Sequence, residues 1–206
     1  MITKQKIKYV LHEALFYVAL LFLGVAINTF ILVNASVPSG SMESTIMTGS
    51  RVMGLRLAYV LGEPQRGDVV VFKFGQICKN CGVHVEDTDT KICTFCEKEL
   101  KGSKTLHYVK RLIGVPGDHI EIKGDPLRGA TVYINGEAID EPYINNGVMD
   151  YDNYYEFDVP EGEYFFLGDN RNDSVDSRYW HDPYITRDEL EGKAYVVYFP
   201  KVSYIG

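Results

Sequence analysis

The stretch ALFYVALLFLGVAINTFILV, residues 14–33, determines how the rest of the chain is organised. Its twenty residues carry no formal charge. As a helix they are long enough to cross a hydrocarbon core of about 30 Å. Three lysines precede the run: Lys4, Lys6 and Lys8. By the positive-inside rule, the N-terminus is predicted to stay in the cytoplasm and everything after residue 33 to emerge on the outer face.

Two other interpretations of this run remain open. Asn34-Ala35-Ser36 places small residues after it, as a cleaved signal peptide would. The apolar part of a signal peptide is only about 7 to 15 residues long, however, so an uncleaved membrane anchor is favoured. A buried core helix is disfavoured because the run has no polar face.

The composition indicates one soluble β-rich domain behind the span. The chain has 206 residues and a net charge of −7, which argues against a general nucleic-acid binder because such proteins carry basic surfaces. The chain holds 15 tyrosines, 10 phenylalanines and 19 glycines, in short apolar runs separated by turns, and this pattern favours strands. We therefore predict a cytoplasmic segment 1–13, a transmembrane helix 14–33 and an extracytoplasmic domain 34–206.

The strands are predicted from short apolar or alternating runs between turn residues. Asn135-Gly136 separates two such runs and is the strongest hairpin signal in the chain. Thr186 is expected to cap a single helical turn. The fold class is therefore mainly β and antiparallel, with one N-terminal helix. The expected strands are residues 50–60, 68–74, 106–115, 119–122, 131–134, 137–139, 154–159, 164–167 and 194–199.

Residues 76–104 interrupt this pattern with two CxxC pairs eleven residues apart. They are Cys78 with Cys81, and Cys93 with Cys96. Four thiolates at such a spacing can close a tetrahedral structural zinc site in a small zinc ribbon. Disulfides are the rival, because the predicted location outside the cell permits oxidation. A redox pair is a third reading. Catalytic zinc is disfavoured, since four protein ligands leave no position for water.

The segment VPSGSMESTI, residues 37–46, follows the span almost directly. Ser-Gly-Ser-Met is a small-residue turn of the kind that presents a side chain to a substrate. Alone it is more typical of an ordinary loop. Its significance depends on two downstream stretches, YVKRLIGVPGD at 108–118 and GDNRNDSVDSR at 168–178.

Together these motifs resemble bacterial type I signal peptidases. VPSGSMEST, RGDVVVF, YVKRLIGVPGD and GDNRNDSVDSRYW occur in this order after a single span, and the resemblance covers residues 14–200 outside the cysteine insert. It implies an antiparallel β catalytic domain of the type shared with SOS-repressor proteases. It also implies a serine endopeptidase on the outer face of the membrane, which agrees with the topology inferred from the lysines.

The resemblance implies a Ser/Lys mechanism in which Ser41 is the nucleophile and Lys110 its general base. A serine hydroxyl is a weak nucleophile until a base removes its proton. An exposed lysine titrates near pH 10, so Lys110 must be buried to act as a base at neutral pH. Its apolar neighbours favour burial. The alternative, from strand alternation alone, is that Lys110 points outward and Arg111 inward.

Further roles are carried over from the family by matching positions. Ser39 is expected to help hold the oxyanion, and Ser174 to orient the lysine amine. The supporting polar residues would be Arg111, Asp169, Asp176 and Arg178, whose ordinary interpretation is surface ion pairing that contributes little. One departure is Ser44, where the family usually has proline, and this change predicts a less rigid loop.

The expected function is removal of signal peptides from exported preproteins after small residues, of the Ala-x-Ala type, with no cofactor required for catalysis. The substrate is expected to pair with backbone near residues 37–39 and 68–72. The expected partners are preproteins, the lipid bilayer and the secretion machinery, with no nucleic acid.

Several rivals stay open at this stage. The nearest is a related Ser/Lys protease with another target, and the next is a membrane-anchored zinc-ribbon adaptor or pseudo-enzyme that binds preproteins without cutting. A zinc or cobalt hydrolase lacks the open His/Glu cluster it would need. A Ser–His dyad would use one of four scattered histidines: His84, His107, His119 and His181.

Overall fold

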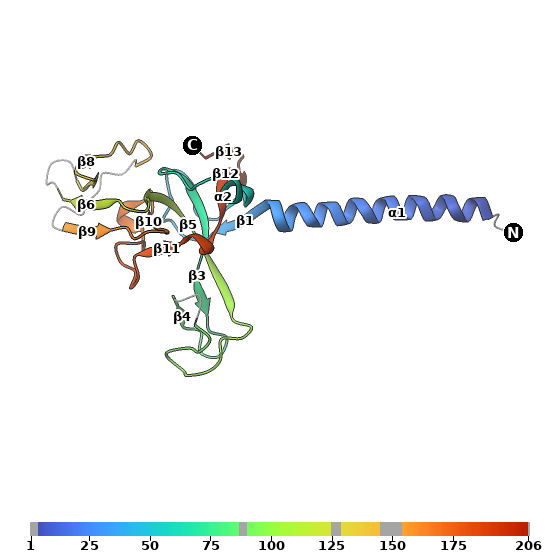
Figure 1. The fold of residues 1–206 in the computed structure, drawn as a ribbon, viewed down its shortest axis with the longest axis horizontal. Helices are drawn as coiled ribbons and strands as arrows, with labels where there is room; N and C mark the ends of the chain where they lie inside the picture. Colours follow the sequence, from blue (N-terminus) through green and yellow to red (C-terminus); the bar gives the residue numbers. More distant parts are fainter. Residues whose placement is uncertain (1–3, 87–89, 125–128, 145–153, 206) are drawn as a thin grey trace.

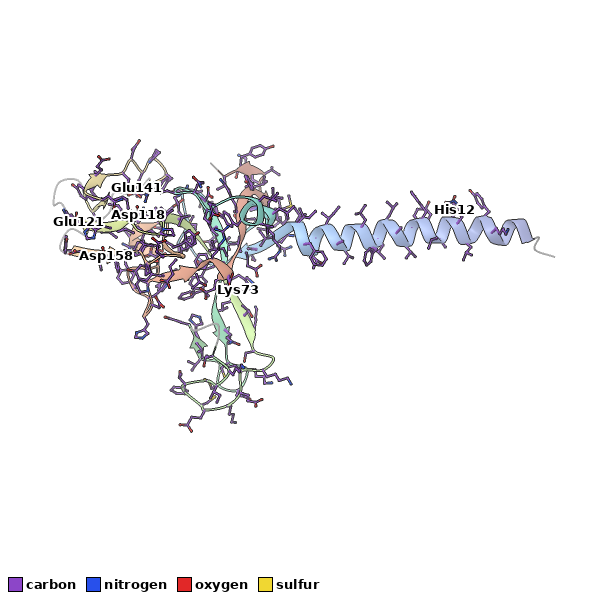
Figure 2. All side chains as sticks on the ribbon, in the orientation of Figure 1. His12, Lys73, Asp118, Glu121, Glu141 and Asp158 are labelled. Carbon is purple, nitrogen blue, oxygen red and sulfur yellow. The ribbon has the colours of Figure 1, made fainter. Side chains whose placement is uncertain are left out.

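The computed structural model describes residues 4–86, 90–124, 129–144 and 154–205. A long helix, α1 (Lys4–Ala26), continues through a π-helical turn, Ile27–Ile31, and projects from a β body (Figure 1). Its apolar part, Leu11–Ile31, has a mean hydropathy of 2.2, and none of its most apolar stretch is buried against the rest of the described chain. His12 and the other drawn side chains along it stand free of the body (Figure 2). The single N-terminal helix predicted from the sequence is confirmed.

The end of the predicted span was wrong by two residues. Leu32 and Val33 already belong to strand β1 (Leu32–Val37), which pairs antiparallel with β2 (Ser50–Leu55). Val33 is 2 % exposed and packs into the core, so its apolar character serves the sheet and not the lipid.

A second correction concerns residues 50–60, expected as one strand. The strand ends at Leu55, and a short helix, α2 (Leu57–Leu61), follows. The Arg56 backbone N–H donates to the Ile31 carbonyl and its side chain to the Leu32 carbonyl, which turns the chain there. The helix then buries Tyr59, whose hydroxyl donates to Asp68 at 3.1 Å.

The main sheet has nine strands and holds most of the core. Its path runs β1-β2-β12-β3-β5-β10-β11, with β13 paired to β12 and β4 paired to β3, and the strand pairs are antiparallel. The remaining bounds are β3 (Val69–Ile77), β4 (His84–Val85), β5 (Lys104–Gly114), β10 (Glu163–Leu167), β11 (Tyr184–Thr186), β12 (Leu190–Phe199) and β13 (Ser203–Tyr204).

A separate four-stranded sheet lies beyond the main one, at the end of the body far from α1 (Figure 1). Asn135 and Gly136 adopt φ of 53° and 84° at the tight turn between β7 and β8, so the predicted hairpin is confirmed. The strand order is β8-β7-β6-β9, with bounds β6 (His119–Lys123), β7 (Thr131–Ile134), β8 (Glu137–Ala138) and β9 (Tyr154–Asp158).

The remaining short helices lie near the ends of strands. Thr186 caps the 3₁₀ turn Arg187–Glu189 through a capping box with Glu189, as the sequence predicted. A second 3₁₀ turn, Arg171–Asp173, follows β10. The mainly antiparallel β fold class is therefore confirmed.

Candidate active site

The Ser41 turn, which we define as residues 38–49 between β1 and β2, packs on the core through apolar side chains. Met42 and Ile46 are fully buried in the core, and the Ile46 N–H donates to the Met42 carbonyl at 2.7 Å. Ser41 stands above them and is 7 % exposed. Its Oγ lies 3.3 Å from the Ser39 Oγ. The burial of Met42 and Ile46, four residues apart, therefore anchors the turn that carries Ser41.

Ser41 opens into a cleft of about 450 Å³. One wall is residues 36–41, as expected, and the other is residues 106–110 of β5. The expectation that residues 68–72 form the second wall was wrong. Strand β3 is paired on both sides, with β12 and β5, and Val69–Phe72 are at most 2 % exposed.

Lys110 projects from β5 into this cleft and is only 3 % exposed. Its Nζ donates to the Ser174 Oγ at 3.0 Å. The pKa of Lys110 is lowered from its ordinary 10.5 to about 8, chiefly by burial and also by the charge of Arg178, against the opposing charges of nearby aspartates. The choice between Lys110 inward and Arg111 inward does not arise, because both are buried in this part of β5.

A turn that begins at Gly168 brings the Ser174 segment against the Ser41 turn. A Cβ at Gly168 would lie 2.2 Å from the Ser174 Oγ and 2.5 Å from the Ser41 carbonyl oxygen, so a side chain cannot fit there. The Asn170 N–H donates to the Ser41 carbonyl and its side-chain amide to the Gly40 carbonyl, each at 3.0 Å. Glycine is thus required by a close approach between two segments of the site.

Two buried ion pairs support this turn. Arg111 donates to both carboxylate oxygens of Asp169 at 2.8 Å, and Arg178 donates to Asp176 at 2.8 and 3.0 Å. Burial disfavours the ionised form of Asp176, but the Arg178 contacts more than offset it and lower the pKa of that carboxyl. The four side chains are at most 3 % exposed, so these are not the weak surface pairs of the ordinary interpretation.

Sequence reasoning missed a group of supporting residues that we call the strap, Glu141–Tyr143. The Tyr143 ring lies 3.8 Å from the Arg111 guanidinium, and Glu141 (labelled in Figure 2) forms a buried ion pair with Arg171. Ser44 donates to the Tyr143 carbonyl at 2.8 Å and adopts φ of 85°, which proline cannot take. The loop expected to lose rigidity at Ser44 is therefore tied to the strap.

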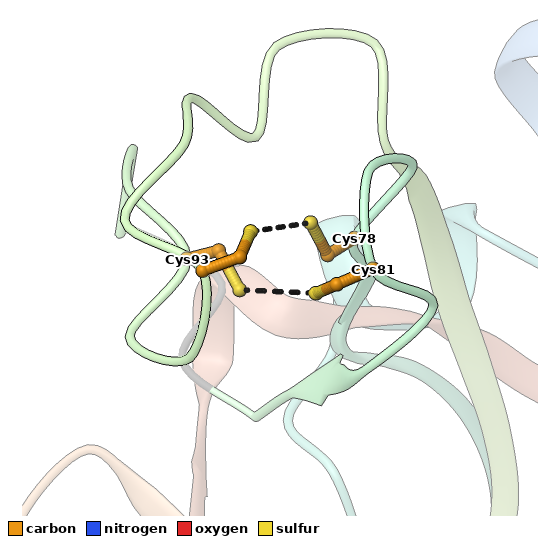
Figure 3. A group of neighbouring side chains, drawn as sticks. Cys78, Cys81 and Cys93 are labelled. Atoms are coloured by element: carbon orange, nitrogen blue, oxygen red, sulfur yellow. Dashed lines mark hydrogen bonds between the residues drawn. The ribbon is translucent and has the colours of Figure 1, made fainter.

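The four cysteines converge at the tip of the β3–β5 excursion (Figure 3). Their Sγ atoms all lie within 4.8 Å of one another, with Cys78–Cys96 and Cys81–Cys93 at 3.7 Å. All four are free thiols. Such a cluster could hold a metal ion.

Comparison with known proteins identifies the family of this chain. Residues 8–199 match the family described as signal peptidase, peptidase S26. This chain belongs to that family. It is 34 % identical to the probable signal peptidase I-2 of Synechocystis sp. over 89 % of this chain and 70 % of that protein. It is 31 % identical to signal peptidase I S of Bacillus subtilis over 95 % of this chain and 92 % of that protein.

The resemblance drawn from the four motifs is thus confirmed, since signal peptidase I of Bacillus licheniformis is also 32 % identical over 86 % of this chain and 82 % of its own length. This chain is therefore a serine endopeptidase, a hydrolase of the signal peptidase I group. Its N-terminal apolar helix fits a membrane anchor. Membership supports signal-peptide removal as its activity, and catalysis in this group requires no cofactor.

Proposed function

We propose that the chain cleaves signal peptides by acyl-enzyme chemistry with Ser41 as nucleophile and Lys110 as general base. The observation that carries this proposal is the shared cleft, into which both side chains project, with the lysine amine almost fully buried. A pKa of about 8 leaves roughly a tenth of the amine neutral at pH 7. Ser174 accepts a hydrogen bond from that amine and so fixes its direction.

The steps follow from these positions. Neutral Lys110 removes the Ser41 proton as Oγ attacks the carbonyl carbon of the scissile bond. The oxyanion that forms is stabilised by the Ser41 N–H and the Ser39 hydroxyl, whose oxygen lies 3.3 Å from the Ser41 Oγ. The lysine proton passes to the leaving amine, which departs with the mature protein. Water, activated by the same lysine, then releases the signal peptide and restores Ser41.

The supporting residues keep these groups in place. The Arg111–Asp169 and Asp176–Arg178 pairs hold the Gly168 turn, and that turn contacts both Ser174 and the Ser41 carbonyl. Separating the partners of a buried ion pair leaves an uncompensated charge, which is strongly unfavourable. Each pair therefore opposes movement of the turn that carries it. We infer that the four act as positioning residues.

The experiment that tests the proposal is cleavage of a preprotein with an Ala-x-Ala site in detergent or liposomes. We expect the wild type to cut at that site and Ser41→Ala to lose activity by at least about 10³-fold, since the nucleophile is absent. Ser203→Ala, at an exposed serine of β13, is the matched control and should cut normally. Binding of the preprotein without cleavage by the wild type would favour the adaptor interpretation instead.

We infer that the helix crosses the membrane once, with residues 1–13 in the cytoplasm and residues 34–206 outside. The three lysines before the span support this orientation. The span delivers Ser41 to the lipid surface, where a preprotein held by its own signal sequence presents its cleavage site. This placement also permits contact with the secretion machinery.

External protease tests the orientation. Added to intact spheroplasts, it should degrade the β domain and leave a tag at residue 1 protected. After lysis, the tag should be degraded as well. Protection of the β domain in intact spheroplasts would contradict the proposed orientation.

We also propose that Cys78, Cys81, Cys93 and Cys96 bind one structural zinc ion. Four thiolates at Zn–S distances of about 2.3 Å lie about 3.8 Å apart in a tetrahedron, and the Cys78–Cys96 and Cys81–Cys93 sulfur pairs here lie at 3.7 Å. A disulfide would need about 2.05 Å. Burial raises the pKa of the Cys78 thiol, but the backbone N–H groups of Asn80 and Cys81 outweigh it and lower that pKa to about 6.

A further inference from the structure

Between its two CxxC pairs, the cysteine excursion comes back to the end of β3 and forms strand β4, which has only two residues. His84 and Val85 pair antiparallel with Ile77 and Gln76 at the end of β3. The approach is close, since a Cβ at Gly75 would lie 2.0 Å from the Val85 carbonyl oxygen, and Gly75 adopts φ of 67°. Position 75 of β3 therefore requires glycine if β4 is to pair there.

Strand β4 covers an aromatic cluster that we define as Phe74, Tyr108 and Trp180. The His84 ring lies 5.4 Å from Phe74 and 6.5 Å from Tyr108, centroid to centroid. Phe74 in turn lies 4.3 Å from Trp180 and 4.7 Å from Tyr108. Glu86, the residue after β4, accepts a hydrogen bond from the His181 N–H at 3.3 Å, next to Trp180.

This cluster borders the catalytic lysine. Tyr108 precedes Lys110 by two residues on β5, so both side chains point to the same side of the strand. The Lys110 Nζ lies 5.8 Å from the centre of the Tyr108 ring. Tyr108 also lines the substrate cleft. A change in how β4 covers the cluster therefore reaches the wall of the active site.

Strand β4 cannot hold itself in place. Two residue pairs form an element far below the size that is stable alone, and closing a loop between fixed ends costs conformational entropy. The cysteines supply the missing constraint. Cys78 directly follows the last residue of β3, and Cys81 lies three residues before His84, so a metal bound to both fixes the turn between the two strands.

We call the segments Cys78–Cys81 and Cys93–Cys96 the knuckle. From these contacts we infer that the metal-bound knuckle acts as a clasp, meaning that it holds β4 on the aromatic cluster and thereby positions Tyr108 beside Lys110. The inference rests on the zinc site proposed above. It assigns the insert a role in the peptidase reaction without placing the metal in the chemistry. Tyr108 and His84 act as positioning residues.

The chain carries its own reporter for this clasp. Trp180 is its single tryptophan, is 6 % exposed, and its Nε1 has no hydrogen-bond acceptor among the described residues. Its fluorescence therefore reports an apolar surrounding, which water would enter if β4 lifted away. The full-length protein in detergent should be measured with zinc bound, after chelation and after zinc is restored, for zinc content, Trp180 emission and preprotein cleavage.

We expect chelation to shift Trp180 emission to longer wavelength and to slow cleavage on the order of tenfold, chiefly in kcat, with both effects reversed by zinc. His84→Ala should bind zinc at unchanged stoichiometry yet reproduce both effects, because it removes the ring contacts of β4 with the aromatic cluster and leaves the four cysteines unchanged. Phe95→Ala, a 73 % exposed knuckle residue, should bind zinc and produce neither effect.

Unchanged emission and cleavage after zinc removal, or in His84→Ala, would overturn the clasp even if zinc is bound. Failure to bind zinc at all would remove the metal site and the clasp together. In either case, the peptidase mechanism is tested separately by the loss of cleavage in Ser41→Ala. Failure of the clasp is therefore distinguishable from failure of the peptidase mechanism.

Discussion

Lys110→Met is expected to reduce preprotein cleavage by at least about 10³-fold while leaving the protein folded. Methionine has nearly the length of lysine and is apolar, and the site it would occupy is 3 % exposed. The loss would therefore come from the missing amine and not from altered packing. Single-turnover cleavage should be measured beside thermal unfolding, with Ser41→Ala as the inactive reference.

The pH dependence provides the independent check on Lys110. Because the base must be neutral, kcat/KM of the wild type should rise about tenfold per pH unit toward the pKa of about 8 and level off above it. The folded pKa lies below the ordinary 10.5, so the folded state binds fewer protons between these values. The free energy of unfolding of the wild type should therefore rise from pH 8 to 10.5, relative to Lys110→Met.

One result would reassign the base. If Lys110→Met cut at the wild-type rate, a histidine would have to replace the lysine. Of the histidines in the described chain, His107 lines the Ser41 cleft, with its Nε2 3.6 Å from Glu191. His107→Gln in the Lys110→Met background would then be the decisive variant, and its loss of activity would establish a Ser–His dyad.

The residues of the site could be proposed from the sequence through the family resemblance, because each motif that carries it lies within one short stretch. The turn that presents Ser41, the strand that carries Lys110 and the Gly168 turn are each encoded locally, by small residues or by apolar runs. The Asn135-Gly136 hairpin followed for the same reason, since positive φ at both positions is a local demand.

The parts that could not be predicted depend on packing between distant segments. Nothing local marks Tyr143 as the residue that covers Arg111, or Glu141 as the partner of Arg171, since each pair meets only when the small sheet docks on the main one. The prediction of the second wall of the cleft was wrong for a related reason. Apolar runs at β3 and β5 look alike in sequence, and only the strand order shows which one borders Ser41.

Asp169→Ala is expected to lower the free energy of unfolding by about 3 to 5 kcal/mol, because it leaves the Arg111 guanidinium buried without its carboxylate. Arg111 and Asp169 are 3 % and 0 % exposed, so water cannot replace the lost partner. Asp169 also accepts a hydrogen bond from Thr45 of the Ser41 turn at 2.5 Å. The substitution should therefore impair cleavage as well as stability, by loosening the turn that presents Ser41.

A surface ion pair provides the matched control for Asp169. Glu63 pairs with Arg187 but is 73 % exposed, and Glu63→Ala should cost less than about 1 kcal/mol. Denaturant unfolding of both variants in the same detergent gives the comparison. The double variant Arg111→Met with Asp169→Leu should recover part of the stability lost in Asp169→Ala, since no charge is then left buried, but it should not recover cleavage. Equal small losses for Asp169→Ala and Glu63→Ala would mean that the buried pair contributes no more than a surface one. The Gly168 turn would then have to be held by the Asp176–Arg178 pair and by the hydrogen bond from the Asn170 N–H to the Ser41 carbonyl.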